Sequence, residues 1–108
     1  MDLLCRTVIV GTMPTLQLTG EIDLASVPSL HDAMRRLIRD HPAQVVAIDL
    51  DGVSVLDDAG LGVLLGNAGR AREQGGDVVL VCTSERLRQR FEVTGLARAV
   101  DVRDRLAP

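Results

Sequence analysis

Residues 45–66 read VVAIDLDGVSVLDDAGLGVLLG, and this stretch decides the fold. It opens with an apolar run that does not alternate with polar residues, which favours a strand buried on both faces at the centre of a sheet. We place that strand at residues 44–50. A helix is expected to follow over residues 59–73. A buried strand that leads into a helix is typical of α/β proteins.

Short polar motifs set the limits of these two elements. Asp51-Gly52 is a turn dipeptide, so we expect the chain to leave the strand there. Either Asp57 or Asp58 can cap the helix, because a carboxylate at this position accepts hydrogen bonds from the free N–H groups of the first turn. The glycine pair at residues 75–76 ends the helix.

The N-terminal part of the chain predicts a hairpin and a helix. Residues 4–10 are a β-rich apolar run, residues 11–14 are a turn that contains proline, and residues 15–19 alternate between apolar and polar side chains. Residues 20–25 then form a loop. Apolar residues at helical spacing predict a helix over residues 26–40, capped by the serine at its start.

The C-terminal part repeats the alternation of strand and helix. Residues 77–82 are a second buried apolar run. Thr83 or Ser84 can cap a third helix, which Gly95 ends in a left-handed conformation. Residues 96–102 predict a last short strand. The order β-β-α-β-α-β-α-β indicates an α/β fold: a mixed, mostly parallel sheet with an antiparallel hairpin at its edge, packed by helices.

The composition fits one soluble domain over residues 1–108. Hydrophobic residues make up 46% of the chain, charged residues 25%, and the net charge is −3. With Phe91 as the only aromatic residue and a negative net charge, neither nucleic acid nor an anionic membrane is expected as a partner. No apolar run is long enough to span a membrane. Cys5 and Cys82 fit a reduced, cytoplasmic protein in which both are small buried residues.

The aspartates of residues 49–58 suggest an enzyme, but their context does not support one. A strand that ends in D-x-D-G resembles the motif of haloacid-dehalogenase-type phosphatases, with Asp49 as nucleophile and Asp51 as acid. That family and the response-regulator receiver domains both need a later basic residue, normally lysine, and this chain contains no lysine. An EF-hand calcium loop needs glycine at its sixth position, whereas Gly52 is fourth from Asp49. We therefore expect no catalytic residue and no metal.

The glycines at positions 60, 62, 66 and 69 do not form a nucleotide-binding loop. The dinucleotide fingerprint is G-x-G-x-x-G, and Gly66 arrives one residue late. The segment also lies inside the expected helix, where glycines let a helix lie close to a sheet. We therefore expect no cofactor.

Three segments together resemble the STAS domain, a family named for sulfate transporters and anti-sigma factor antagonists. The family signature, D-L-x-x-V-x-x-x-D-S-S-G-L-G-V-L, appears here as DLDGVSVLDDAGLGVLL at residues 49–65. A second motif, L-x-G-E-x-D, appears as LTGEID at residues 18–23. A third, S-x-x-V-x-x-x-F/L-x-x-x-G-L, appears as SERLRQRFEVTGL at residues 84–96. The resemblance covers nearly the whole chain, in order.

The resemblance implies a binding module and not an enzyme. Bacterial single-domain members bind an anti-sigma factor, a serine kinase of the histidine-kinase-like ATPase type, and thereby release a sigma factor for transcription. The kinase phosphorylates the first serine of the D-S-S-G motif, which breaks the complex. Asp58 stands at the position of that serine here, and Ala59 replaces the second serine. The phosphorylation switch is therefore expected to be absent or altered.

Two interpretations of Asp58 follow from this substitution. An ionised aspartate carries one negative charge and a phosphoserine about −1.5 to −2, so Asp58 is an imperfect mimic of the phosphorylated state. The protein either binds its kinase poorly, as if it were always phosphorylated, or has a partner adapted to an acid at this position. Both interpretations stay open at the level of the sequence.

The resemblance also implies a docking face, made by the loop over residues 20–25 and the start of the second helix. We expect this face to be acidic, with an apolar anchor and with glycines that keep the approach open for a partner backbone. Its residues are Glu21, Asp23, Asp57, Asp58, Ala59, Gly60 and, as the anchor, Leu61. We expect a monomer or weak dimer. The competing hypothesis is a STAS domain that serves as a nucleotide-sensing or scaffold module in another regulatory assembly.

Overall fold

The computed structural model describes residues 2–106, and its sheet has five strands in the order β1-β2-β3-β4-β5. β1 pairs antiparallel with β2, and the other neighbouring strands are parallel. The strands are β1 (Leu4–Val10), β2 (Met13–Ile22), β3 (Val45–Leu56), β4 (Asp77–Val81) and β5 (Asp101–Arg103). The expected mixed α/β fold with an antiparallel edge hairpin is therefore confirmed.

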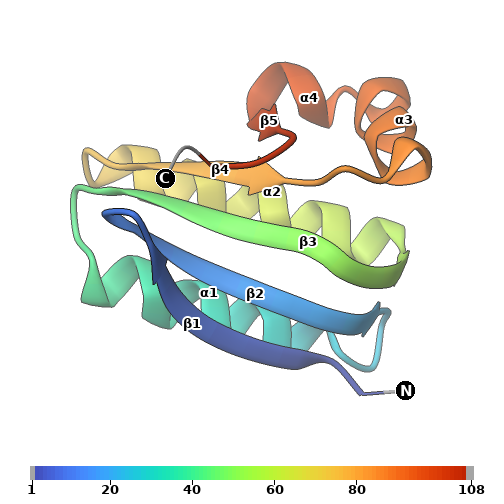
Figure 1. Cartoon of the computed structure of the whole chain (residues 1–108), viewed down its shortest axis with the longest axis horizontal. Coiled ribbons are helices and arrows are strands. Elements are labelled where there is room, and N and C mark those ends of the chain that lie inside the picture. The colour runs from blue at the N-terminus through green and yellow to red at the C-terminus, as the bar shows by residue number, and fades with distance from the viewer. Residues whose placement is uncertain (1, 107–108) are drawn as a thin grey trace.

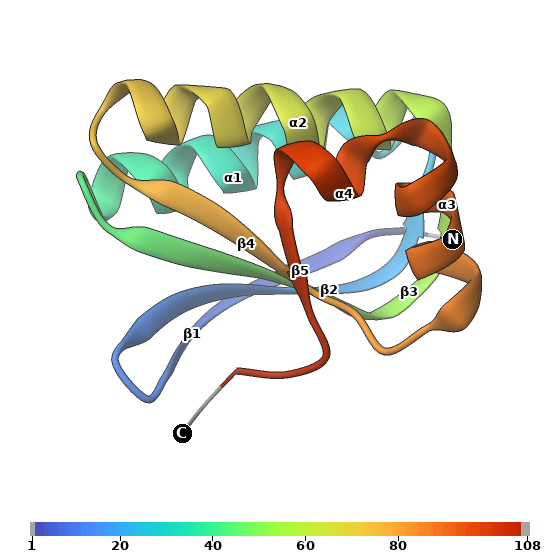
Figure 2. The same cartoon turned by 90° about the horizontal axis from the view of Figure 1, so that it is seen from above.

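The helices lie on one face and at one edge of the sheet (Figure 1 and Figure 2). The helices are α1 (Val27–Asp40), α2 (Asp58–Glu73), α3 (Glu85–Thr94) and α4 (Leu96–Ala99). α1 and α2 run side by side over the same face, because each joins two neighbouring parallel strands by a crossover of the same hand. α3 and α4 lie at the β5 edge. No described helix is long and apolar enough to cross a membrane.

The main core fills the space between the sheet and the two long helices. Alternate residues of the central strands, such as Leu18, Ile48 and Leu80, point to this side and are at most 1% exposed. Leu30 of α1 and Leu64 of α2 meet them and are fully buried. Full burial of one such side chain contributes about 1.5–3 kcal/mol to the free energy of unfolding.

The other face of the sheet has no helix over it (Figure 2). Ala47, Val79 and Val81 form a small cluster there, and Met13 and Leu106 pack against them. Ala47 is fully buried. The expected burial of both faces of the central strand is confirmed at this position, but the C-terminal segment covers the second face in place of a helix.

Both central strands are longer than predicted. β2 continues through Ile22 into the expected loop, and β3 continues to Leu56 through the expected turn at Asp51-Gly52. The prediction of a turn was therefore wrong. A Cβ atom at Gly52 would lie 2.6 Å from the backbone oxygen of Leu18, so glycine lets β2 and β3 approach where their register is irregular.

The predicted strand over residues 96–102 is wrong in its first half. This segment forms the short helix α4, and β5 begins only at Asp101. Gly95 has the expected left-handed conformation, with φ of 82°. Of the two candidate caps of α3, Ser84 is the one used: its hydroxyl oxygen accepts a hydrogen bond from the Leu87 N–H at 3.3 Å.

The two cysteines have different environments. Cys82 is fully buried after β4, as expected, whereas Cys5 is exposed on β1, and its expected burial was wrong. β2 and β3 separate the two strands, so the thiols lie too far apart to pair within one chain. Burial raises the pKa of the Cys82 thiol above its ordinary value.

Candidate functional site

The start of α2 is joined to the end of β2. Asp57 is the N-cap of α2: its Oδ1 accepts a hydrogen bond from the Gly60 N–H at 3.2 Å. The Asp57 N–H donates to the Ile22 carbonyl oxygen at 3.0 Å. Of the two candidate caps, Asp57 is therefore the one used. The helix begins at Asp58, one residue before the predicted start.

Asp58 faces solvent and is paired with an arginine of α3. Its side chain is 92% exposed, and its Oδ1 accepts a hydrogen bond from Arg90 Nη2 at 2.7 Å. Arg86, one turn earlier in α3, donates to the Ser54 carbonyl oxygen at 2.6 Å. The surface around Asp58 therefore contains two arginines in addition to the acids that the sequence predicted. The sequence-based prediction missed both arginines because each lies 32 residues away along the chain from its partner.

Two residues of the expected docking face lie inside the protein. Leu61 is only 8% exposed and belongs to the main core, so its side chain is not a surface anchor. Gly60 is buried, and a Cβ atom there would lie 2.5 Å from Ile22 Cγ2 and 2.7 Å from Leu56 Cδ1. This glycine lets α2 lie close to the strands and does not open an approach for a partner. Gly62 is exposed, with open space at its Cβ position.

Asp23 organises the turn before α1. Its Oδ1 accepts a hydrogen bond from the Ser26 N–H at 3.0 Å, and the Ser26 hydroxyl oxygen accepts one from the Asp23 N–H at 3.0 Å. The Ser26 hydroxyl donates to the Glu21 carbonyl oxygen at 2.8 Å. Ser26 thus occupies the N-cap position but bonds to the preceding turn and not to the helix, contrary to the prediction. Glu21 and Asp23 flank Ile22, so this turn lies next to the start of α2.

The aspartates within β3 have structural partners. Asp49 Oδ1 accepts a hydrogen bond from the Asp51 N–H at 2.9 Å. Asp51 Oδ1 accepts hydrogen bonds from the N–H and the hydroxyl group of Thr83, at 2.7 and 3.0 Å, and so ties β3 to the segment before α3. Among residues 2–106, no group of three or more His, Cys, Asp or Glu side chains is placed to hold a metal ion.

Two exposed apolar side chains near the acids of the expected docking face were not predicted. Leu24, in the turn before α1, is 77% exposed, and Val93 of α3 is 81% exposed. Val93 lines a shallow hollow together with Asp58. The helical phase of α3 is the signal that could have identified Val93, because Leu87 and Phe91 mark the buried side of the helix. We define the α2-start surface as Glu21, Asp23, Leu24, Asp57, Asp58, Ala59 and Val93.

Comparisons with known proteins agree with this architecture. The sequence model of the STAS domain matches residues 6–107. The anti-sigma-B factor antagonist of Bacillus subtilis (strain 168) is 36% identical over 87 residues, which are 81% of this chain and 78% of that protein. A crystal structure of an anti-sigma factor antagonist from Mycobacterium paratuberculosis has a TM-score of 0.85 at 23% identity, and the match covers 96% of this chain and 87% of the other.

A second solved structure shows the same fold. The anti-sigma factor antagonist SpoIIAA in its unphosphorylated form has a TM-score of 0.72 at 18% identity, over 95% of this chain and 90% of the other. The match to the STAS domain begins within β1 and includes all the later strands and helices described above. The chain therefore belongs to the STAS domain family, and it is similar to anti-sigma factor antagonists, which are non-catalytic regulators.

Proposed function

We propose that this protein binds an anti-sigma factor of the serine kinase type and so releases a sigma factor, in the cytoplasm and without the usual serine switch. The observation that carries the proposal is the 36% identity to the anti-sigma-B factor antagonist of Bacillus subtilis, over 81% of this chain. Asp58 occupies the position at which the family motif D-S-S-G has its phosphoacceptor serine, and Ala59 has no hydroxyl group. A kinase therefore has no serine to phosphorylate at this position.

The α2-start surface is the docking surface in this proposal. It combines acids with the exposed apolar side chains of Leu24 and Val93. Apolar contacts surrounded by a polar rim are typical of protein interfaces. The acids attract a basic partner surface and raise the association rate more than the affinity. Binding is therefore expected to slow as the salt concentration rises.

The ion pair between Asp58 and Arg90 favours the hypothesis of a partner adapted to an acid. A phosphoserine carries about −1.5 to −2 charges, whereas an aspartate carries one. Arg90 offsets that single charge at a distance of 2.7 Å. With Arg90 counted in each state, the net charge of the pair is about +1 for an unmodified serine, zero for Asp58 and about −0.5 to −1 for a phosphoserine. The Asp58–Arg90 pair is neutral, whereas a phosphoserine would leave a net negative charge beside Arg90, and this difference supports a native protein that is competent to bind.

The proposal is tested by binding to the anti-sigma kinases of the organism that encodes this chain, with ATP present. We expect native protein to bind one of these kinases and to gain no phosphate by mass spectrometry. Asp58→Ser should bind the same kinase, gain one phosphate and then dissociate. Asp40→Ser removes an exposed aspartate at the end of α1 and is the matched control, which should behave as native protein does.

Two results would contradict this proposal. If neither native protein nor Asp58→Ser binds any of the kinases, the protein is not an antagonist of them. If only Asp58→Ser binds, the aspartate is a built-in off state and Arg90 does not offset it. Arg90→Gln provides an independent check, because it should weaken kinase binding by native protein and leave binding by Asp58→Ser unchanged.

A further inference from the structure

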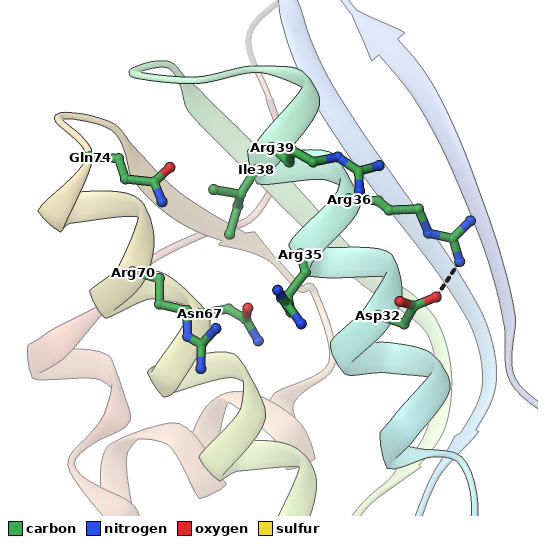
Figure 3. Close-up of a pocket in the computed structure, with 8 residues that line it drawn as sticks. All are labelled: Asp32, Arg35, Arg36, Ile38, Arg39, Asn67, Arg70 and Gln74. Carbon is green, nitrogen blue, oxygen red and sulfur yellow. Dashed lines mark hydrogen bonds and ion pairs between the residues drawn. The ribbon is translucent and has the colours of Figure 1, made fainter.

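A groove of about 390 Å³ runs between α1 and α2 (Figure 3). Arg35 lines it from α1, and Asn67 and Arg70 line it from α2. Gln74 lies where α2 ends, and Ile38 adds an apolar side chain. Ligand pockets typically have volumes of about 300–1,000 Å³, so the groove has the size of a site for one small molecule.

Two arginines of the groove lack an acidic partner. Arg36 and Arg39, which also border it, each pair with an aspartate of α1. Within residues 2–106, neither Arg35 nor Arg70 forms an ion pair with a carboxylate. Asp32 also lines the groove, but it pairs with Arg36, so Arg35 and Arg70 remain without a carboxylate partner in a chain whose net charge is −3.

The groove also contains a buried amide with an unused acceptor. Asn67 is 1% exposed, and its Nδ2 donates to the Val63 carbonyl oxygen at 3.0 Å and lies 3.1 Å from His31 Nδ1. Turning the amide over would place its oxygen against the Val63 oxygen, so these partners fix its orientation. Asn67 Oδ1 then has no hydrogen-bond donor among the described residues. Buried acceptors are normally satisfied, so a water molecule or a ligand is expected to bring a donor to this oxygen.

We propose that this groove binds a small phosphate ester that carries a hydroxyl group near its phosphate. Arg35 and Arg70 come from different helices and suit the phosphate oxygens, because a guanidinium group donates paired hydrogen bonds to phosphate. The hydroxyl group donates to Asn67 Oδ1. A bare anion would satisfy the arginines only, and an apolar ligand would satisfy neither the arginines nor the amide.

The groove is separate from the α2-start surface. Arg70 follows Asp58 by twelve residues in α2, which corresponds to about 18 Å along the helix axis. Arg90 and Val93, which surround Asp58, do not line the groove. The proposal therefore does not depend on binding to an anti-sigma factor, and the two experiments can fail independently.

Calorimetric titration with glycerol 3-phosphate tests the proposal, and n-propyl phosphate serves as a similar ligand without hydroxyl groups on its carbon chain. We expect saturable binding of glycerol 3-phosphate and about tenfold weaker binding of n-propyl phosphate. Arg35→Gln and Arg70→Gln should each weaken binding of glycerol 3-phosphate about tenfold. Arg6→Gln is the matched control, because Arg6 is exposed on the opposite face of the sheet.

Several outcomes would overturn the proposal. If native protein shows no saturable binding of glycerol 3-phosphate, the groove is not a binding site for it. If Arg6→Gln weakens binding as much as Arg35→Gln and Arg70→Gln do, the attraction is non-specific. Equal affinity for the two esters would remove the role of Asn67. A lipid headgroup could also supply a phosphate ester with a nearby hydroxyl group, and vesicles that contain phosphatidylglycerol test this source. Binding to such vesicles without binding to glycerol 3-phosphate would assign the groove to a lipid and reject a free ester.

Discussion

Gly60 and Gly62 lie two positions apart in α2 and have opposite surroundings. A Cβ atom at Gly60 would overlap the side chains of Ile22 and Leu56, whereas nothing lies within 4 Å of the Cβ position at Gly62. The same substitution at the two positions therefore separates the effect of packing from the effect of helix propensity.

Gly60→Ala should lower the free energy of unfolding by about 1–3 kcal/mol, because α2 must move away from the strands to make room for the methyl group. Gly62→Ala should raise the free energy of unfolding by about 0.5–1 kcal/mol, because alanine loses less conformational entropy in a helix. Urea unfolding followed by circular dichroism measures both changes. Two changes of the same sign would contradict the packing at the start of α2.

The buried thiol of Cys82 limits stability at alkaline pH. Burial raises its pKa most; the Ser84 backbone and Arg88 act against this. The carboxylates of Asp51 and Asp49 act with burial, so that the pKa is raised overall. The unfolded chain therefore loses this proton at a lower pH than the folded chain does. The stability from this group is fully present below about pH 8.5, the ordinary value of a thiol, and is lost as pH rises through the higher pKa of the folded state.

Native protein should therefore be less stable at pH 9.5 than at pH 7.5, and the thiol contributes at most about 1.4 kcal/mol per pH unit above 8.5. Cys82→Ala should lose less stability over the same interval, because the variant has no thiol proton to release at this position. Urea midpoints at the two pH values give the comparison. An equal loss in the variant would assign the alkaline effect to other groups.

At the scale of the elements, a single side chain sets the start of α2. Asp57→Ala should lower the free energy of unfolding by about 1 kcal/mol, because the Gly60 N–H loses its side-chain acceptor. Asp58→Ala should have a smaller effect, because its ion pair with Arg90 is exposed. Thermal unfolding of both variants provides the test, and a larger loss in Asp58→Ala would show that the cap has been assigned to the wrong aspartate.

Local patterns were sufficient to predict the order of the elements but not all of their limits. The hairpin, the helical period of α1 and the cap of α3 depend on residues close together in the sequence. The prediction of a turn at Asp51-Gly52 was wrong because β3 continues there in parallel pairing with β2, where Gly52 stands opposite Thr19. The prediction of a strand over residues 96–102 was wrong in its first half because a short apolar run fits a helix as well as a strand.

The candidate site was predictable in its position and less so in its details. The motif around Asp58 located the start of α2, and one of the two candidate caps is used. The arginine that pairs with Asp58 comes from α3, and no local pattern links the two residues. Leu61 was expected as the surface anchor but is buried, and the exposed Val93 was not predicted, because the side of a helix that is buried depends on what packs against it.

At the scale of the whole molecule, the C-terminal segment shields the face of the sheet that no helix covers. Leu106 packs on the cluster of Ala47, Val79 and Val81. Leu106→Ser should lower the free energy of unfolding by about 1 kcal/mol, because this apolar cover is lost. Leu4→Ser is the control on the same face, since Leu4 is 67% exposed, and it should change stability by less than about 0.5 kcal/mol. Equal losses in urea unfolding would show that Leu106 does not cover the sheet.

The order of the strands in the sheet is also their order in the chain. No strand has to be inserted between two strands that are already paired. During synthesis, each strand that leaves the ribosome adds to the edge left open by the previous one, and pairing between successive segments favours fast folding. β5 and the segment up to Leu106 come last, and they close the final edge and cover the second face. The β4 edge of the nascent sheet therefore stays unpaired until β5 has emerged.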